Sequence, residues 1–412
     1  MASAPLRLLI YSANFAPEPT GIGKYSGEMA AWLAAHGHEV RVVAAPPYYP
    51  AWKLDPAYAW PPYRVERWQG VDVWRAPLWV PPQPGGLKRV LHLVTFAMSS
   101  LPVMLAQVLW RPQVVLVVAP ALVCAPSGWL VARLAGGKAW LHVQDFEVDV
   151  AFQMGLLKGT LARRAILAAE RWLLRRFDRV SSISRRMRER LLDKGVAPQR
   201  VLDLPNWVDV EHLRPLTGPS PYRAELGIAA DAVVALFSGT LGNKQGLMLI
   251  PEAARLLAHQ PEIVFVVCGD GVMKPALHAA CVGLPNVRLL PLQPAARLPE
   301  LLGLADIHLL TQSPGAEDLV LPSKLSGMLA SGRPVLATCR EGTEIAEVVA
   351  NCGLVVPPED ATAFAAAVAS LAAAPERRAA MGLVARQIAV DRMSVGGVMA
   401  GLVAQLKQLV AA

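Results

Sequence analysis

The chain has 412 residues, which exceeds the size at which one hydrophobic core stops growing and predicts two domains of roughly 200 residues each. Hydrophobic residues make up 54% and charged residues 17%, a balance that excludes a disordered or coiled-coil protein and favours buried parallel sheets. The five cysteines lack CxxC spacing, which indicates neither a disulfide framework nor a zinc site and is typical of a reducing cytosol.

Strand-like apolar runs alternate with helix-like segments from end to end, which is the pattern of βα units around parallel sheets. In the first half we predict strands at residues 6–13, 39–45, 71–77, 114–120, 139–145 and 179–184. In the second half we predict strands at residues 233–239, 263–269, 287–292, 306–312, 334–339 and 353–358.

A segment rich in Pro, Gly and Ser follows Asp209 and predicts the boundary between the domains. We therefore expect α/β, Rossmann-like, doubly wound domains at residues 1–208 and 209–390, with a C-terminal helix at 391–412 that packs back on the first domain. Two such domains in tandem predict an interdomain cleft lined by the carboxyl ends of both sheets. The chemistry is therefore expected in loops that follow strands.

Two such loops lie in the first half. Gly21 and Gly23 follow the first strand and would let the backbone approach a ligand at the start of a helix, although a tight turn alone is the alternative. Asp145 directly follows a later strand and is expected to act as a base or to orient a hydroxyl, with a helix cap as the alternative. Asp145, Glu147 and Asp149 could together grip a metal, but no other acid or His is near in sequence, so no metal is expected.

The loop that opens the second domain has small residues followed by a lysine. Gly239 and Gly242 form a turn after the strand, and Lys244 precedes the next helix. A diphosphate there would meet backbone N–H groups, a helix dipole and an ammonium group together. A solvated lysine in a turn is the alternative interpretation.

A second anion site is predicted at the start of a helix near residue 322. Ser323 is expected near the helix cap, and Lys324 at its mouth can meet another phosphate oxygen. Glu317 and Asp318 lie in the preceding loop, where carboxylates could accept hydrogen bonds from sugar hydroxyls. A purely structural capping role for Ser323 and Lys324 is the alternative.

The charge is divided unevenly between the halves of the chain. Residues 1–205 hold 25 Lys and Arg against 14 Asp and Glu, whereas residues 206–412 hold 15 against 18. A basic half binds nucleic acid or an anionic membrane surface. Here the basic residues lie among large apolar ones, which favours the membrane and argues against nucleic acid.

One basic and apolar segment is a predicted helix at residues 158–177. Helical spacing places Arg164, Arg171 and Arg175 on one stripe beside an apolar stripe that contains Trp172. This is the layout of an interfacial helix, and a fully solvated basic face is the alternative.

The other segment, residues 87–110, opens with Lys88 and Arg89 and then carries no charge over its last 18 residues. Its length would admit a transmembrane helix. Because Pro102 stands in the middle and helices are needed between strands, an interfacial or core pair of helices is the preferred interpretation.

These motifs together resemble the large GT-B family of retaining glycosyltransferases numbered family 4. The likeness covers almost the whole chain and is carried, in the family's order, by TGIGKY, SSISRRMRERLLDKGV, LPNWVD, SGTLGNKQGL, CGDG, LPELLGLADIHLL and LPSKLSGMLASGRPVLAT. Within the family, the N-terminal run NFAPEPTGIGKYSGEMAAWLAAHGHEV is most similar to colanic-acid-type enzymes of exopolysaccharide assembly.

The resemblance implies transfer of a sugar from a UDP- or GDP-linked donor, with retention, to a saccharide on a polyprenyl diphosphate at the cytoplasmic face of a bacterial membrane. It implies a catalytic role for Lys244, a phosphate role for Lys324 and a donor-sugar role for Asp318, and no metal or other cofactor. A sugar-nucleotide epimerase of the same architecture, acting on a soluble donor, is the alternative. A non-catalytic binding protein is a third hypothesis.

The chain departs from the family's pattern near the nucleotide. The Glu that the family places five residues before the glycine of its AxG segment is Gly327 here, and its partner Glu is replaced by Leu319 beside Asp318. The basic residue often found soon after SG is Thr240 or Leu241. The sequence therefore leaves the bound nucleotide open.

Overall fold

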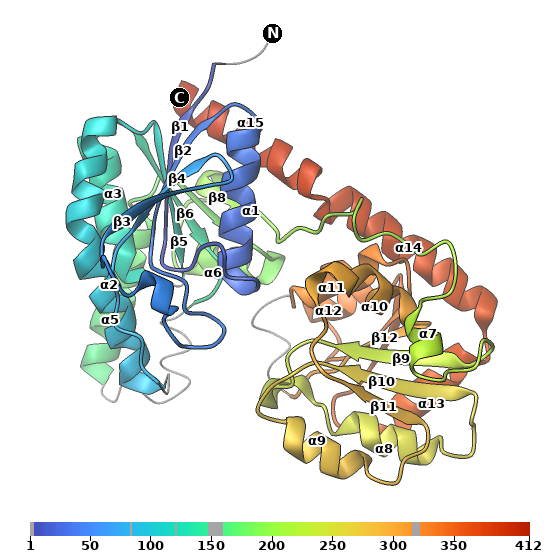
Figure 1. Cartoon of the computed structure of the whole chain (residues 1–412). Helices are drawn as coiled ribbons and strands as arrows, with labels where there is room; N and C mark the ends of the chain where they lie inside the picture. The colour runs from blue at the N-terminus through green and yellow to red at the C-terminus, as the bar shows by residue number, and fades with distance from the viewer. Residues whose placement is uncertain (1–3, 83–84, 120–121, 147–159, 315–321) are drawn as a thin grey trace. The chain divides into compact units, whose positions relative to one another are not determined.

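The computed structural model describes residues 4–82, 85–119, 122–146, 160–314 and 322–412. Its contacts divide the chain into two α/β units, the first made of residues 1–205 with 399–412 and the second of residues 206–398 (Figure 1). Each unit is built on its own sheet, one of eight strands and one of six. The two-domain, doubly wound prediction is therefore confirmed.

The sheet of the first unit runs in the order β3-β4-β2-β1-β5-β6-β7-β8. All neighbours are parallel except β3 and β4, which form an antiparallel hairpin at the edge. The turn of that hairpin, Gln69 and Gly70, has positive φ at both residues, as a tight two-residue hairpin requires. The strands are β1 (Arg7–Ser12), β2 (Glu39–Ala44), β3 (Arg64–Trp68), β4 (Val71–Arg75), β5 (Val114–Ala119), β6 (Lys138–Val143), β7 (Arg179–Ser182) and β8 (Val201–Asp203).

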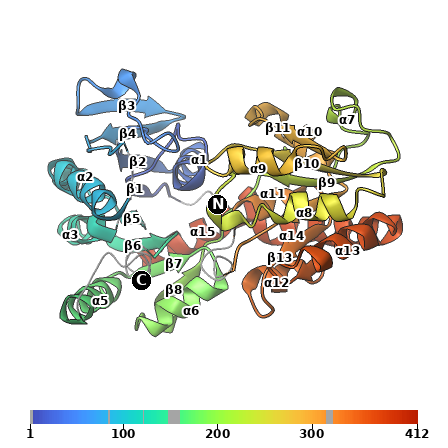
Figure 2. The ribbon, with the colours of Figure 1, turned by 90° about the horizontal axis from the view of Figure 1, so that it is seen from below.

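The α-helices of this unit pack on the sheet through apolar faces such as Tyr25, Met29 and Leu33 of α1. Both views place α2, α3 and α5 side by side along one flank of the unit (Figures 1 and 2). The helices are α1 (Gly21–Ala35), α2 (Gly86–Ala106), α3 (Ala125–Leu134), α5 (Thr160–Leu174), α6 (Arg185–Asp193) and α15 (Val395–Ala411).

The sheet of the second unit is wholly parallel, in the order β11-β10-β9-β12-β13-β14. Its strands are near-continuous apolar runs because helices cover both faces. The strands are β9 (Val233–Ser238), β10 (Ile263–Cys268), β11 (Val287–Leu290), β12 (Ile307–Leu310), β13 (Val335–Thr338) and β14 (Gly353–Val356). The helices are α7 (Tyr222–Glu225), α8 (Leu249–Leu256), α9 (Lys274–Cys281), α10 (Leu298–Leu304), α11 (Lys324–Ala330), α12 (Glu344–Val349), α13 (Ala361–Ala372) and α14 (Pro375–Met393).

The direction of strand addition reverses beside the first strand of each sheet, between β1 and β5 and between β9 and β12. In open α/β sheets, ligands bind outside the carboxyl ends of the strands at such a switch point. The loops that follow these strands are therefore where a site is expected in each unit.

Two predicted helices differ in the structure. The tail is not one helix from Asp391, because α14 continues to Met393 and α15 begins at Val395, with Ser394 between them in a β-bridge to Val208. Residues 87–110 form one helix, α2, followed by a 3-10 turn, rather than a pair of helices. Pro102 lies inside α2, where it removes a single backbone donor without ending the helix.

Candidate functional site

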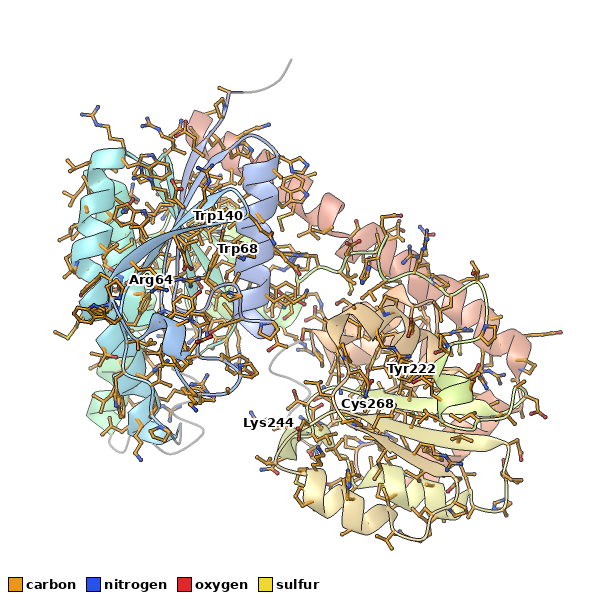
Figure 3. The ribbon with its side chains drawn as sticks, in the orientation of Figure 1. Arg64, Trp68, Trp140, Tyr222, Lys244 and Cys268 are labelled. Atoms are coloured by element: carbon orange, nitrogen blue, oxygen red, sulfur yellow. The ribbon has the colours of Figure 1, made fainter. Side chains whose placement is uncertain are left out.

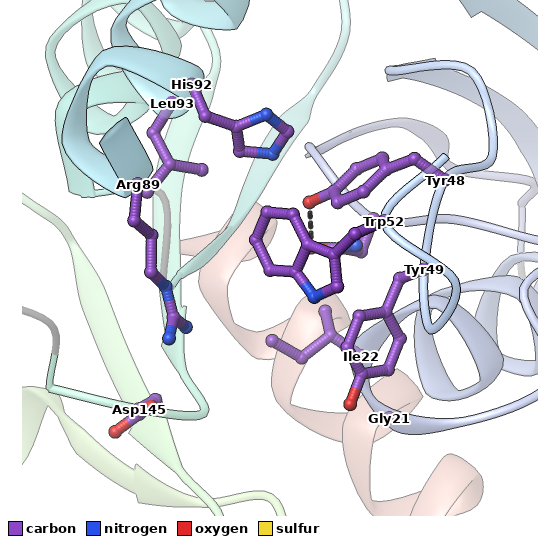
Figure 4. Close-up of a pocket in the computed structure, with 10 residues that line it drawn as sticks. Gly21, Ile22, Tyr48, Tyr49, Trp52, Arg89, His92, Leu93 and Asp145 are labelled. Atoms are coloured by element: carbon purple, nitrogen blue, oxygen red, sulfur yellow. Dashed lines mark hydrogen bonds between the residues drawn. The ribbon is translucent and has the colours of Figure 1, made fainter. Parts of the chain in front are cut away.

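A pocket in the first unit opens at the carboxyl ends of its strands (Figure 4). Its volume is about 170 Å³. The lining residues come from the loops after β1, β2 and β6 and from the first turns of α1 and α2: Asn14, Gly21, Ile22, Tyr48, Tyr49, Trp52, Arg89, His92, Leu93 and Asp145. The fold thus gathers Gly21, Arg89 and Asp145, three residues singled out from the sequence, around one cavity.

Glu18 holds the aromatic wall of this pocket in place. Its carboxylate is buried and accepts hydrogen bonds from the backbone N–H groups of Tyr48 (3.2 Å) and Tyr49 (3.1 Å) and from Nδ2 of Asn14 (3.0 Å). Burial raises the pKa of Glu18, and these hydrogen bonds together with the Arg75 guanidinium oppose the rise. Gly23 packs against Glu18, because a Cβ at residue 23 would lie 2.6 Å from the Glu18 Cβ. Gly23 therefore has a packing role beside the pocket.

His92 lies on the pocket wall beside two aromatic rings. It is only 1% exposed, and its Nδ1 is 2.6 Å from the backbone oxygen of Trp79. Its ring lies edge-on to Tyr48, with centroids 4.6 Å apart, and 5.3 Å from the Trp52 ring. Its Nε2 has no hydrogen-bond partner among the described residues. No pattern in the sequence indicates His92, Tyr48 or Trp52, since only the fold brings residue 52 to residue 92.

The predicted anion site of the second unit centres on Lys324, the first residue of α11. Its Nζ donates to Oε1 of Gln245 at 3.1 Å and lies 4.0 Å from the centroid of the Phe237 ring. Burial lowers the pKa of this ammonium group to about 7. Among the described residues no carboxylate lies within ion-pair distance of it. A half-buried cation with a neutral partner is poised for an anionic ligand.

The glycine turn after β9 makes room for this lysine. Gly239 has φ of +137°, and a Cβ there would lie 3.4 Å from Cδ of Lys324. Residues 243–245 form a 3-10 turn that Ser313 fastens to the end of β12, its N–H donating to the Lys244 carbonyl oxygen at 3.0 Å. The Lys244 side chain is exposed, at the rim of the unit (Figure 3). The Lys324–Gln245 hydrogen bond thus joins α11 to the loop that carries Lys244.

Ser323 occupies the position before α11, but its side chain makes no capping hydrogen bond. Ser323 therefore lies near the cap, as expected, but the alternative of a purely structural capping role has no hydrogen bond to support it, because the backbone of Ser323 is already helical. Four other predicted residues, Glu147, Asp149, Glu317 and Asp318, lie outside the described residues.

The basic residues predicted to meet a membrane belong to α2 and α5 or directly follow α5, and we call the flank formed by α2, α3 and α5 the α2–α3–α5 face. Arg164 and Arg171 of α5, Arg175 directly after it and Lys88 of α2 are exposed, and Trp172 is 52% exposed. The apolar side chains Leu87, Met98 and Leu109 are 70%, 71% and 89% exposed. Among the described residues, Gly86–Trp110 is the one helical stretch long and apolar enough to cross a membrane, and 28% of its most apolar window is buried.

Comparison with known proteins gives the family. Residues 20–207 match the family described as "Glycosyl transferase 4-like domain", and residues 232–374 match "Glycosyl transferases group 1". The chain is 42% identical over 375 residues to "Putative colanic acid biosynthesis glycosyl transferase WcaI" of Escherichia coli K12, covering 88% of this chain and 91% of that protein. The chain belongs to glycosyltransferase family 4. Its fold is GT-B.

Solved structures agree with the fold of this glycosyltransferase. The sucrose-phosphate synthase of Thermosynechococcus elongatus superposes with a TM-score of 0.75 at 17% identity, over 98% of this chain and 99% of that one. Anabaena HepE in complex with UDP superposes with a TM-score of 0.72 at 16% identity, over 98% and 100% of the two chains.

Gly327 lies where the resemblance implies a ribose-binding Glu. It belongs to α11, and a Cβ there would lie 3.3 Å from Cδ1 of Leu302 and 3.8 Å from Cδ1 of Leu213. A longer side chain would have to displace these two leucines. The packing therefore accounts for a glycine at this position in this glycosyltransferase.

Proposed function

We propose that this glycosyltransferase moves a sugar from a UDP- or GDP-linked donor to a saccharide carried on a polyprenyl diphosphate, with retention, during exopolysaccharide assembly. The identity to WcaI over most of both chains supports the pathway, since that relative bears the name of colanic acid biosynthesis. The HepE structures with UDP and UDP-glucose support a nucleotide-sugar donor.

The observation that carries the proposal is the Lys324 ammonium group, held at the carboxyl end of β9 by Gln245 and Phe237. As the anomeric bond breaks, negative charge builds on the leaving diphosphate, and fixed donors aimed there stabilise that transition state. Lys324 and Lys244, which precedes Gln245 in the chain, supply positive charge. We propose that no metal or other cofactor takes part. We also propose that the carboxylates of Glu317 and Asp318 bind the donor sugar.

The acceptor is assigned to the first unit. Asp145 on the pocket wall would orient or deprotonate the attacking hydroxyl, and Arg89 would meet the diphosphate of the carrier. The α2–α3–α5 face would rest on the cytoplasmic surface of an anionic membrane, where exposed apolar side chains and arginines act together.

Donor binding and transfer test the proposal together. UDP-, GDP- and ADP-sugars are screened by thermal shift, and transfer is measured to polyprenyl-diphosphate saccharides extracted from membranes. We expect Lys244→Ala to lower transfer by roughly 100-fold, because one such donor contributes about 3 kcal/mol to transition-state stabilisation.

Lys407 in α15 is exposed and distant from Lys244 in the sequence, so it offers a matched control. The Lys407→Ala variant should transfer sugar at the wild-type rate. Normal turnover of Lys244→Ala would remove that residue from the role. Conversion of the donor to an epimer without any acceptor would replace the proposal with the epimerase.

A further inference from the structure

The pocket of the first unit holds a buried hydrogen-bond acceptor that no residue in the described part of the chain satisfies. The Nδ1–H of His92 donates a hydrogen bond to the Trp79 carbonyl oxygen. The lone pair of Nε2 can therefore accept a hydrogen bond from a ligand. Burial and the nearby Arg89 lower the pKa of His92, so the ring is neutral at neutral pH. An unpaired buried polar atom costs free energy unless a ligand satisfies it.

An aromatic surface stands next to this acceptor. Trp52 packs 5.5 Å from the Tyr48 ring and 5.3 Å from His92, and Figure 4 shows its indole between His92 and Tyr49. Trp52 has φ of +50°, a left-handed conformation that is uncommon for a bulky residue. Such strain persists where the surroundings enforce it, and it concentrates at ligand sites.

The size of the pocket limits what can enter. A cavity of about 150 Å³ accommodates one six-membered ring, and this pocket measures about 170 Å³. One ring fits, whereas a nucleotide with its base, ribose and phosphates would not.

We propose that this pocket is the subsite for one neutral pyranose of the acceptor, which stacks on Trp52 while one of its hydroxyl groups donates to Nε2 of His92. This inference rests on the proposed function, because it names the part of the acceptor that the first unit recognises. A pyranose presents an apolar ring face and several hydroxyl donors, which are the two features that the wall offers to match. Glu18 acts as a positioning residue, since its bonds to the Tyr48 and Tyr49 backbone fix that wall.

The chemistry of His92 also sets a specificity. A carboxylate has no proton to donate at neutral pH, so a uronic acid that faced Nε2 with its carboxylate would leave that atom unsatisfied. We therefore expect methyl glucoside or methyl galactoside to bind better than the matching methyl glucuronide.

Two substitutions at His92 separate the acceptor atom from the fold. His92→Asn keeps a donor for the Trp79 carbonyl oxygen but removes the acceptor at the ε position, and His92→Gln places an amide oxygen near that position. Binding of methyl pyranosides to the full chain is followed by saturation-transfer NMR. We expect His92→Asn and Trp52→Ala to weaken binding at least tenfold, and His92→Gln to retain most of it.

UDP binding, and hydrolysis of the donor in the absence of acceptor, report whether a variant is folded and whether its second unit is intact. Both should stay normal in the His92 variants, whereas Lys324→Met should bind UDP only weakly and keep pyranoside binding. Equal pyranoside binding by wild type and His92→Asn would overturn the inference, as would displacement of the pyranoside by uridine. Loss of transfer in every assay with pyranoside binding intact would instead count against the proposed function.

Discussion

At the scale of single residues, burial decides which polar groups are ready for chemistry. Lys324 donates one hydrogen bond to the Gln245 side chain, and its positive charge meets no carboxylate among the described residues. His92 donates one hydrogen bond to the Trp79 carbonyl oxygen, and its Nε2 acceptor is not used by the described part of the fold. The sequence predicted Lys324 because a helix followed it. It could not predict His92, whose partner and aromatic neighbours come from other loops.

The lowered pKa of Lys324, about 7, makes donor binding depend on pH. A diphosphate binds the protonated form, so above pH 7 binding must take up a proton, and UDP affinity should fall by up to tenfold per pH unit between pH 7.5 and 8.5. Calorimetry in two buffers of different ionisation enthalpy would measure this uptake. Lys324→Met should bind UDP weakly and without that slope, and an equal slope in both proteins would refute the assignment.

Two buried histidines that belong to neither candidate site make the free energy of unfolding depend on pH. Burial lowers the pKa of His142 to about 4 and of His308 to about 3. Below pH 6.5 the unfolded chain binds a proton at each of these histidines and the folded chain does not. The free energy of unfolding is therefore fully retained above pH 6.5 and falls with decreasing pH, by about 1.4 kcal/mol per histidine per pH unit. Urea unfolding at pH 7 and pH 5 would show this.

His142→Asn should flatten that dependence for the first unit alone, because His142 and His308 belong to different units. The Ser181 hydroxyl beside His142 can still meet an amide, so the variant is expected to fold. An unchanged pH dependence would show that other groups govern the acid transition.

At the scale of elements, strong local patterns were readable and weak ones were not. The twelve apolar runs predicted as strands all appear, since buried parallel strands leave an unbroken signal. Two strands were missed: β3 is a half-exposed edge strand after a Pro-rich run, and β8 has three residues. The Tyr48–Trp52 loop has no periodicity at all, so only its cluster of aromatic residues could have marked the pocket.

The exposed apolar side of α2 should drive membrane association. Leu87→Gln/Met98→Gln removes two side chains that are 70% and 71% exposed, so folding should be unaffected. Burying such a side chain in an apolar phase contributes roughly 1.5–3 kcal/mol, and we expect the vesicle-bound fraction to fall at least tenfold. Flotation with phosphatidylglycerol vesicles measures it. Unchanged flotation would assign α2 to another role, such as packing against a protein.

At the scale of the whole molecule, positive charge is concentrated in the first half of the chain, and Arg164 and Arg171 are exposed on α5. A protein attracted only by its net charge of +8 would respond equally to any lost cation. One that docks through a defined face would respond only to cations on that face, because attraction to an anionic surface decays within a Debye length of about 10 Å at 0.1 M salt.

Two matched variants distinguish these cases. Arg164→Gln/Arg171→Gln lowers the charge by two on α5, and Arg377→Gln/Arg392→Gln lowers it by two on α14 of the second unit, all at exposed positions. Since each surface cation contributes about 1 kcal/mol near an anionic membrane, the α5 pair should weaken vesicle sedimentation by roughly tenfold or more at low salt. The α14 pair should sediment as the wild type does. Equal losses from both pairs would mean that net charge governs the binding, and the α2–α3–α5 face would then have no claim to be the docking surface.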